Sequence, residues 1–97
     1  MSDKLVISSL EDFKAREGDS IQSKAAMLVS GVNEQGNREV LGLRIGDSES
    51  EAFWLETFRW LKQRGLKEVH YVVSDDHSGL VNAAQRCFQG AIWQRCQ

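Results

Sequence analysis

The sequence contains no proline, only two cysteines and no apolar run close to the ~20 residues that a membrane-spanning helix needs. Without proline, no segment of the chain has the proline-containing composition that is usual in linkers. The cysteines, Cys87 and Cys96, are too few for a disulfide framework. The N-terminus lacks the basic and apolar pattern of a signal peptide. These absences predict an intracellular, cytoplasmic protein with no membrane partner.

An excess of basic charge is also lacking. The formal net charge is −2, and the Lys and Arg residues are scattered along the chain. Because affinity for phosphate comes mostly from clustered basic side chains, the composition argues against nucleic-acid binding by this chain alone. The rest is ordinary for a globular protein, with 97 residues, 41% of them hydrophobic and 27% charged. We expect a single domain over residues 1–97.

Apolar runs and turn signals predict five strands and two helices. The strands are expected at residues 4–8, 25–32, 39–45, 68–74 and 90–95, and the helices at residues 48–64 and 78–87. Residues 33–37 are rich in Asn and Gly and predict a β-hairpin between the second and third strands. Residues 9–22 are polar and contain the turn signal Gly18-Asp19, so we expect a loop or an irregular strand extension there.

The first helix carries the clearest packing pattern. Trp54, Phe58 and Leu61 are spaced so that they share one face, which predicts a side buried against the sheet. Ser48 and Glu51 match a capping box at the start of the helix. Gly65 stands where a glycine commonly ends a helix.

The most informative stretch joins the fourth strand to the second helix. The apolar run at residues 69–73 predicts a buried strand, and Ser74, Asp75 and Asp76 follow it directly. Carboxylates at the C-terminal end of a central strand lie where open α/β sheets place their chemistry. Asp75 and Asp76 are therefore either catalytic or metal-binding groups, or residues of a turn that caps the next helix. The pattern alone favours the turn and the cap, because Asp commonly begins helices.

The predicted order is β-β-β-α-β-α-β, which indicates an α/β fold with a mixed sheet covered by helices. This is the topology of the ribonuclease H-like fold. In that fold, carboxylates at the ends of strands one and four lie side by side and hold two metal ions. Those ions stabilise the attacking and leaving oxygens of a phosphodiester exchange.

From residue 23 to residue 96 the chain resembles the catalytic domain of mutator-type bacterial insertion-sequence transposases, which use a DDE active site. The matching pieces are residues 31–36, 38–43, 48–49, 51–54, 61–62, 64–66, 74–75, 77, 79–80 and 93–96. Each piece is weak, but together, in this order and spacing, they are specific.

The resemblance implies that Asp75 is the second metal-binding and catalytic aspartate. His77 follows the motif, and Cys96 matches the start of a cysteine-then-histidine motif, so both are candidate supporting residues. Asp76 is expected to be a surface or capping carboxylate. For the intact family the resemblance implies Mg²⁺ as cofactor, and transposon-end DNA and a transposase oligomer as partners.

The departures from the family's pattern concern the other two acids. The first aspartate is expected near Ser9, and Glu11 or Asp12 could replace it only after a slip of two or three residues. The third acid is expected beyond residue 97. One aspartate cannot hold two divalent ions, so Mg²⁺ binding is expected to be weak or absent.

Two functions remain open. In the first, the chain is a truncated part of a transposase catalytic domain, with an ancestral role in DNA cleavage and strand transfer, and is inactive alone. Whether it is an enzyme is left open, because the DDE set is incomplete. In the second, it is a non-catalytic interaction module that associates with a full-length transposase through exposed sheet edges.

Overall fold

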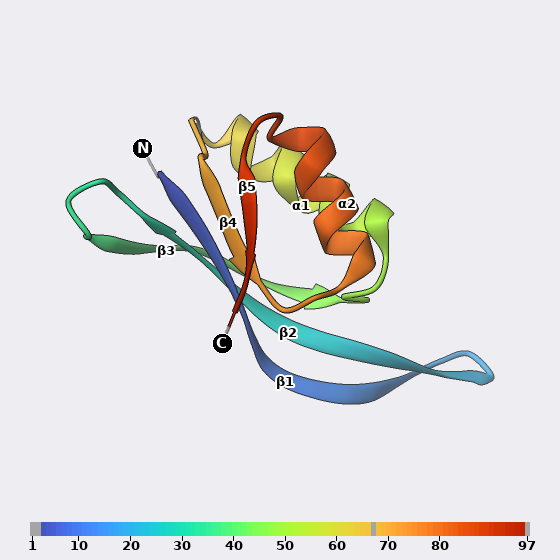
Figure 1. The fold of residues 1–97 in the computed structure, drawn as a ribbon. Coiled ribbons are helices and arrows are strands. Elements are labelled where there is room, and N and C mark those ends of the chain that lie inside the picture. The colour runs from blue at the N-terminus through green and yellow to red at the C-terminus, as the bar shows by residue number, and fades with distance from the viewer. Residues whose placement is uncertain (1–2, 67, 97) are drawn as a thin grey trace.

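The computed structural model describes residues 3–66 and 68–96, apart from the side chains of residues 15, 17, 22 and 23. The elements are β1 (Lys4–Glu17), β2 (Ser20–Val32), β3 (Arg38–Gly46), α1 (Glu51–Gln63), β4 (Tyr71–Ser74), α2 (Ser78–Cys87) and β5 (Ile92–Arg95). The fold is α/β, with a mixed five-strand sheet and two helices, as in a partial ribonuclease H-like fold (Figure 1). The predicted order of elements is confirmed.

The five strands form one sheet in the order β3-β2-β1-β4-β5. β1 pairs antiparallel with β2, and β2 antiparallel with β3. β1 and β4, and then β4 and β5, are parallel. Parallel neighbours need crossover connections, and α1 and α2 lie in those connections. β1 and β4 therefore run in the same direction, and the loop of Asp75 begins where β4 ends, while β1 continues to Glu17.

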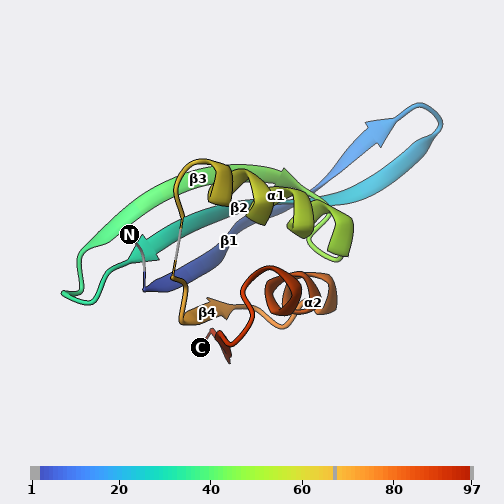
Figure 2. The ribbon, with the colours of Figure 1, turned by 90° about the horizontal axis from the view of Figure 1, so that it is seen from above.

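The first two strands are much longer than the short strands expected there. Of the two expectations for residues 9–22, the irregular strand extension is the one observed. The pairing of β1 with β2 shifts between Ser9 and Glu11, which marks a β-bulge. The strands turn at Gly18, whose φ of 62° suits glycine. The hairpin projects beyond the helices (Figures 1 and 2).

The start of α1 corrects one prediction. The N-cap residue is Ser50, whose hydroxyl accepts a hydrogen bond from the Phe53 N–H at 3.2 Å. The predicted Ser48–Glu51 capping box is therefore wrong. Instead, the Ser48 carbonyl accepts a hydrogen bond from Trp54 Nε1 at 2.9 Å, because that indole is buried and its N–H needs a partner. The other end is as predicted, with Gly65 at a φ of 106°.

Both helices pack on one face of the sheet, and the core lies between them and the strands (Figure 2). Trp54 and Phe58 are fully buried and Leu61 nearly so, which confirms the predicted helix face. They meet alternate residues of the strands, such as Leu5 and Ile7. None of the helices described is long and apolar enough to cross a membrane.

The last two strands are shorter than expected. β4 begins at Tyr71 rather than at residue 68, because Glu68 has a φ of 54° and so breaks the extended backbone. Val69 is still buried although it lies outside the strand. β5 begins at Ile92 rather than at residue 90, since Gly90 has a φ of 86° and forms a turn.

Candidate functional site

Asp75 is the first residue after β4, and its backbone is held by neighbours. Ser74 is fully buried, and its hydroxyl donates to the Asp75 carbonyl at 2.9 Å. The same hydroxyl accepts from Trp93 Nε1 at 2.8 Å, and the Ser74 carbonyl accepts from the Cys96 N–H at 2.7 Å. The Asp75 side chain itself is exposed. A fixed backbone thus presents a carboxylate to solvent.

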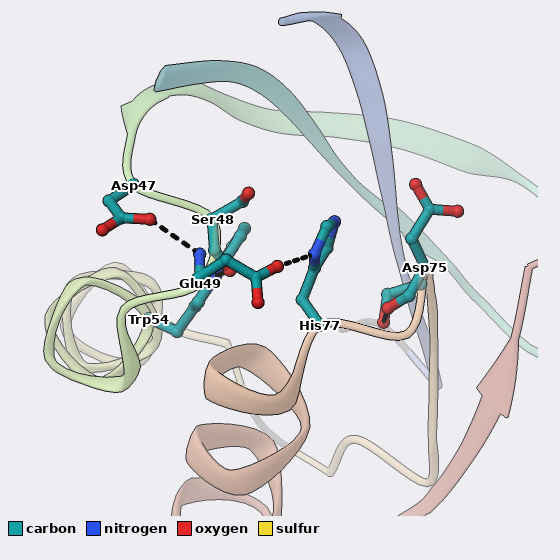
Figure 3. Close-up of polar contacts among 7 residues, drawn as sticks. Asp47, Ser48, Glu49, Trp54, Asp75 and His77 are labelled. Atoms are coloured by element: carbon teal, nitrogen blue, oxygen red, sulfur yellow. Dashed lines mark hydrogen bonds and ion pairs between the residues drawn. The ribbon is translucent and has the colours of Figure 1, made fainter. Parts of the chain in front are cut away.

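His77 is engaged by a carboxylate from another loop. Its Nδ1 pairs with Glu49 Oε1, and the ring lies toward Glu49 while the Asp75 carboxylate lies apart (Figure 3). The His77 N–H also donates to the Asp75 carbonyl at 2.9 Å, which closes the turn. His77 therefore connects the loop of Asp75 to the loop before α1. No local pattern predicts the pairing of Glu49 with His77, because the two residues lie 28 positions apart in the sequence.

The two loops also touch backbone to backbone at Gly79. A Cβ there would lie 2.3 Å from the Glu49 carbonyl oxygen and 2.7 Å from the Glu51 nitrogen. Only glycine allows so close an approach. Asp47 fixes the other side of this loop, because its Oδ1 accepts a hydrogen bond from the Glu49 N–H at 2.9 Å (Figure 3). We call residues 47–51 and 74–79 together the loop junction.

Neither Asp75 nor Asp76 is the N-cap of α2, so the prediction that one of them caps this helix is wrong. The N-cap residue of α2 is His77, and no side chain caps there. Asp76 is exposed, as expected of a surface carboxylate.

The strand pairing locates the position of the first acid. Val6 pairs with Val73, so two further residues bring Ser8 level with Asp75 and leave Ser9 one residue beyond. Glu11 and Asp12 lie three and four residues past Ser8, about 10 Å or more further along the strand. On the other side, Ser74 pairs with Arg95, so one further residue brings Cys96 level with Asp75. The sheet therefore aligns Ser8, Asp75 and Cys96, and it does not bring Glu11 or Asp12 to them.

The donor set does not fit a pair of divalent ions. Carboxylate oxygens suit Mg²⁺, and two ions need several of them. Within residues 3–66 and 68–96 no group of three His, Cys, Asp or Glu side chains could hold a metal. Asp75 is the one acid of the expected pair at this edge, beside a serine and a half-buried free cysteine.

Comparison with known proteins supplies the family. A family model described as Transposase, Mutator family, matches residues 5–97. The chain belongs to this family. The resemblance drawn from the sequence motifs is thus confirmed.

Several mutator-family relatives are similar to nearly the whole chain. It is 42% identical over 84 residues to the transposase for insertion sequence element IS256 in transposon Tn4001 of Staphylococcus aureus. It is 42% identical over 84 residues to the IS1081 transposase of Mycobacterium tuberculosis, and 41% identical over 83 residues to the ISRM5 transposase of Rhizobium meliloti. These matches cover 86–87% of this chain but 20–22% of the relatives. The chain spans about a fifth of the length of the curated relatives it matches.

Proposed function

We propose that this chain is part of the catalytic domain of a mutator-family transposase, in which Asp75 is a metal-binding and catalytic acid. The activity of the whole protein would be metal-dependent DNA cleavage and strand transfer, carried out on DNA in the cytoplasm. The observation that carries the proposal is the place of Asp75, exposed at the carboxyl end of β4 and level with Ser8 of β1. That edge is where open α/β sheets bind ligands.

The loop junction supports this role because it fixes the backbone on both sides of Asp75. Ser74 is held by Trp93, and His77 is held by Glu49. His77 would act as a positioning residue, since its ring is paired with Glu49. Cys96 would support the site from the position directly after β5, where its N–H donates to the Ser74 carbonyl.

The described residues do not make a complete metal site, so we assign the chain alone no step of the reaction. Bound divalent ions supply charge stabilisation to phosphodiester exchange, and this needs acids beyond Asp75. The transposon ends and a transposase oligomer are partners of the proposed whole protein.

A graft into the S. aureus relative tests the proposal. Residues of this chain replace the 84 matched residues of that transposase, and transposition is counted in cells. We expect the unmodified graft to be nearly inactive and Ser9→Asp to raise transposition about a hundredfold or more, because a lost member of a catalytic set removes most of the rate. Ser8→Asp is the parallel variant for the other alignment.

The controls separate the role of Asp75 from effects on folding. Asp75→Asn in the active graft should abolish transposition, whereas Asp76→Asn, its exposed neighbour, should not. Activity that survives Asp75→Asn would exclude Asp75 as a catalytic acid. Inactivity of both aspartate variants at positions 8 and 9, with normal folding, would also contradict the proposal.

The alternative is a non-catalytic module that associates with a full-length transposase. The observation that favours it is the pair of edge strands, β3 and β5, which leave backbone groups without a further strand. Co-purification of the tagged chain with the S. aureus relative, lost when proline replaces Arg95 of β5, is the expected outcome, because the N–H groups of Ile92 and Cys96 point toward β4 and that of Arg95 therefore points to the free edge. A transposase that binds the chain equally well with that proline would exclude pairing at β5.

A further inference from the structure

A groove lies between β3 and the exposed side of α1, outside the candidate site. Figure 2 shows α1 beside β3 on the helix side of the sheet. The groove has a volume of about 510 Å³, and the residues that line it include Arg44 of β3 and Leu55, Glu56, Arg59, Trp60 and Gln63 of α1. We call this lining the arginine groove. Its two arginines and its glutamine carry N–H donors, and Glu56 is the one acid in it.

Trp60 holds two guanidinium groups at this groove. Arg44 Cζ lies 5.6 Å from the centroid of the Trp60 ring and 5.3 Å from that of the Phe53 ring. Arg64 Cζ lies 4.8 Å from the Trp60 centroid, and its Nη1 donates to the Leu41 carbonyl at 3.0 Å. Because the guanidinium is planar, one that stacks on a ring keeps N–H groups at its edge for a further partner. The Trp60 ring therefore orients cations, and it is not left free to stack on a base.

The charge around the groove is positive, although the chain as a whole carries −2. Arg44, Arg59 and Arg64 come from β3 and α1, so the fold gathers basic side chains that are scattered in the sequence. Glu56 opposes them, but its side chain is 76% exposed and its Oε1 lies 3.6 Å from Arg44 Nη2, so this ion pair is weak. Glu39 is an exposed acid further along β3. The arginines outnumber these acids, and the surface suits an anionic partner.

Continuity with the candidate site favours DNA as that partner. α1 begins at Glu51, which belongs to the loop junction, and the groove follows the same helix. Arg59 lies about 12 Å further along the helix axis, a length of three to four base pairs at about 3.4 Å each. The edge around Asp75 is itself acidic, because Asp47 and Glu49 are exposed beside it. Since like charges repel, attraction for DNA phosphates has to come from a neighbouring basic surface.

We propose that the arginine groove, together with Arg64, binds the phosphate backbone of duplex DNA that extends beyond the candidate site. Arg44, Arg59 and Arg64 each donate to a phosphate oxygen, which gives charge-assisted hydrogen bonds. Trp60 keeps two of these guanidinium groups in place. Contacts to the backbone fix the position of the duplex without reading its sequence. The choice of DNA rests on the proposed function, but the contact takes no part in any reaction at Asp75.

Fluorescence anisotropy of the full chain with a labelled DNA duplex of about 20 base pairs, without divalent ions, tests the contact. We expect a micromolar Kd at about 50 mM salt that rises about 40-fold by about 200 mM, because three phosphate contacts release three counterions. Arg59→Ala should raise the Kd about tenfold and make the salt dependence shallower by about one contact. Arg38→Ala, at an exposed arginine of β3 outside the groove, is the matched control and should leave both unchanged.

Glu56→Gln tests the groove in the opposite direction, since it removes the acid and keeps every arginine. We expect it to lower the Kd about threefold. A chain that does not bind the duplex at about 50 mM salt overturns the proposal, as does an equal Kd for Arg59→Ala and Arg38→Ala. Polyglutamate that displaces the labelled duplex as well as unlabelled DNA does would also overturn it, in favour of an acidic protein segment. Transposition of the graft tests Asp75 separately, so a failure of one assay is distinguishable from a failure of the other.

Discussion

The two faces of the same sheet differ in what covers them, and β3 shows this within a single strand. On the helix side it has Gly42 and Gly46, and on the opposite side of the sheet, which we call the open face, Leu43 and Ile45. The glycines are needed because α1 lies so close. A Cβ on Gly46 would lie 2.3 Å from the Phe53 ring, and one on Gly42 would lie 3.0 Å from the Trp60 ring.

The comparison of the two faces shows that an apolar composition does not by itself stabilise the fold. On the open face of β3, Val40, Leu43 and Ile45 are more than half exposed, so within one chain they contribute little of the burial that drives folding. The helix side has smaller residues in β3 but closes around Trp54 and Phe58. Stability should therefore depend on the helix side.

The largest difference is expected between Phe58→Ala and Leu43→Ala. Phe58 is fully buried and its ring stacks edge-on against Phe88 at 5.2 Å, so its removal should lower the free energy of unfolding by about 3–5 kcal/mol. Leu43→Ala should change it by less than about 0.5 kcal/mol. Urea unfolding measures both. Similar losses for the two variants would contradict the division between the faces.

Gly79→Ala tests the loop junction and should have the next largest effect. Its Cβ meets backbone atoms of Glu49 and Glu51, which cannot turn aside, so we expect a loss of about 1–3 kcal/mol. Asn82→Ala, on an exposed position of the same helix, is the control and should be close to neutral. Thermal unfolding compares them. If the Gly79→Ala chain were as stable as the Asn82→Ala chain, the loop junction would have room for a Cβ, and its close packing would not contribute to stability.

Ser50→Ala and Ser48→Ala distinguish the observed helix cap from the one that the sequence suggested. Ser50 caps α1, so its loss should cost about 1 kcal/mol. Ser48 acts through its backbone carbonyl, which alanine keeps, and its substitution should cost less than half as much. Denaturant unfolding of the two variants gives the comparison. The reverse ranking would restore the capping box.

These results show what the sequence could and could not reveal. The hairpin at residues 33–37, the buried face of α1 and the order of elements follow from local patterns, and they are confirmed. The cap was misplaced because Ser48 and Ser50 both suit the pattern, and only burial of the Trp54 indole decides between them. The pairing of His77 with Glu49 depends on two loops that meet only in the folded chain.

The candidate site, too, could be predicted only in part from local sequence patterns. Asp75 was visible as a carboxylate after an apolar run, and its position at the strand end agrees with that expectation. The distance of Glu11 and Asp12 from it depends on the β1–β4 register and on the bulge after Ser9, which no local pattern encodes. Alternation in β3 predicts one buried face without saying which residues face the helices, so the exposed side with Leu43 and Ile45 could not be predicted from it.

The smallest effect on stability is expected from substitution of His70, which lies outside the buried core. The hydrogen bond that the His70 ring donates to the Asp3 carboxylate raises the pKa of His70 above its ordinary 6.5, and the nearby charges of Asp3, Glu68 and Glu34 add to this while desolvation opposes it. A raised pKa stabilises the fold below about pH 6.5, and this contribution is lost as the pH rises through the folded-state pKa. The Tm difference between the unmodified chain and His70→Gln should therefore be larger near about pH 5.5 than near about pH 8. An equal difference at both pH values would rule out the pairing with Asp3.

Calorimetric titration of the full chain with Mg²⁺ tests most directly whether Asp75 lacks the neighbouring carboxylates that binding of two metal ions requires. We expect weak binding that does not saturate, because one carboxylate level with Ser8 and Cys96 gives too few oxygen ligands. Asp75→Ala should then change the titration little, as should Asp76→Ala. Tight, stoichiometric binding that is lost in Asp75→Ala but kept in Asp76→Ala would contradict the account.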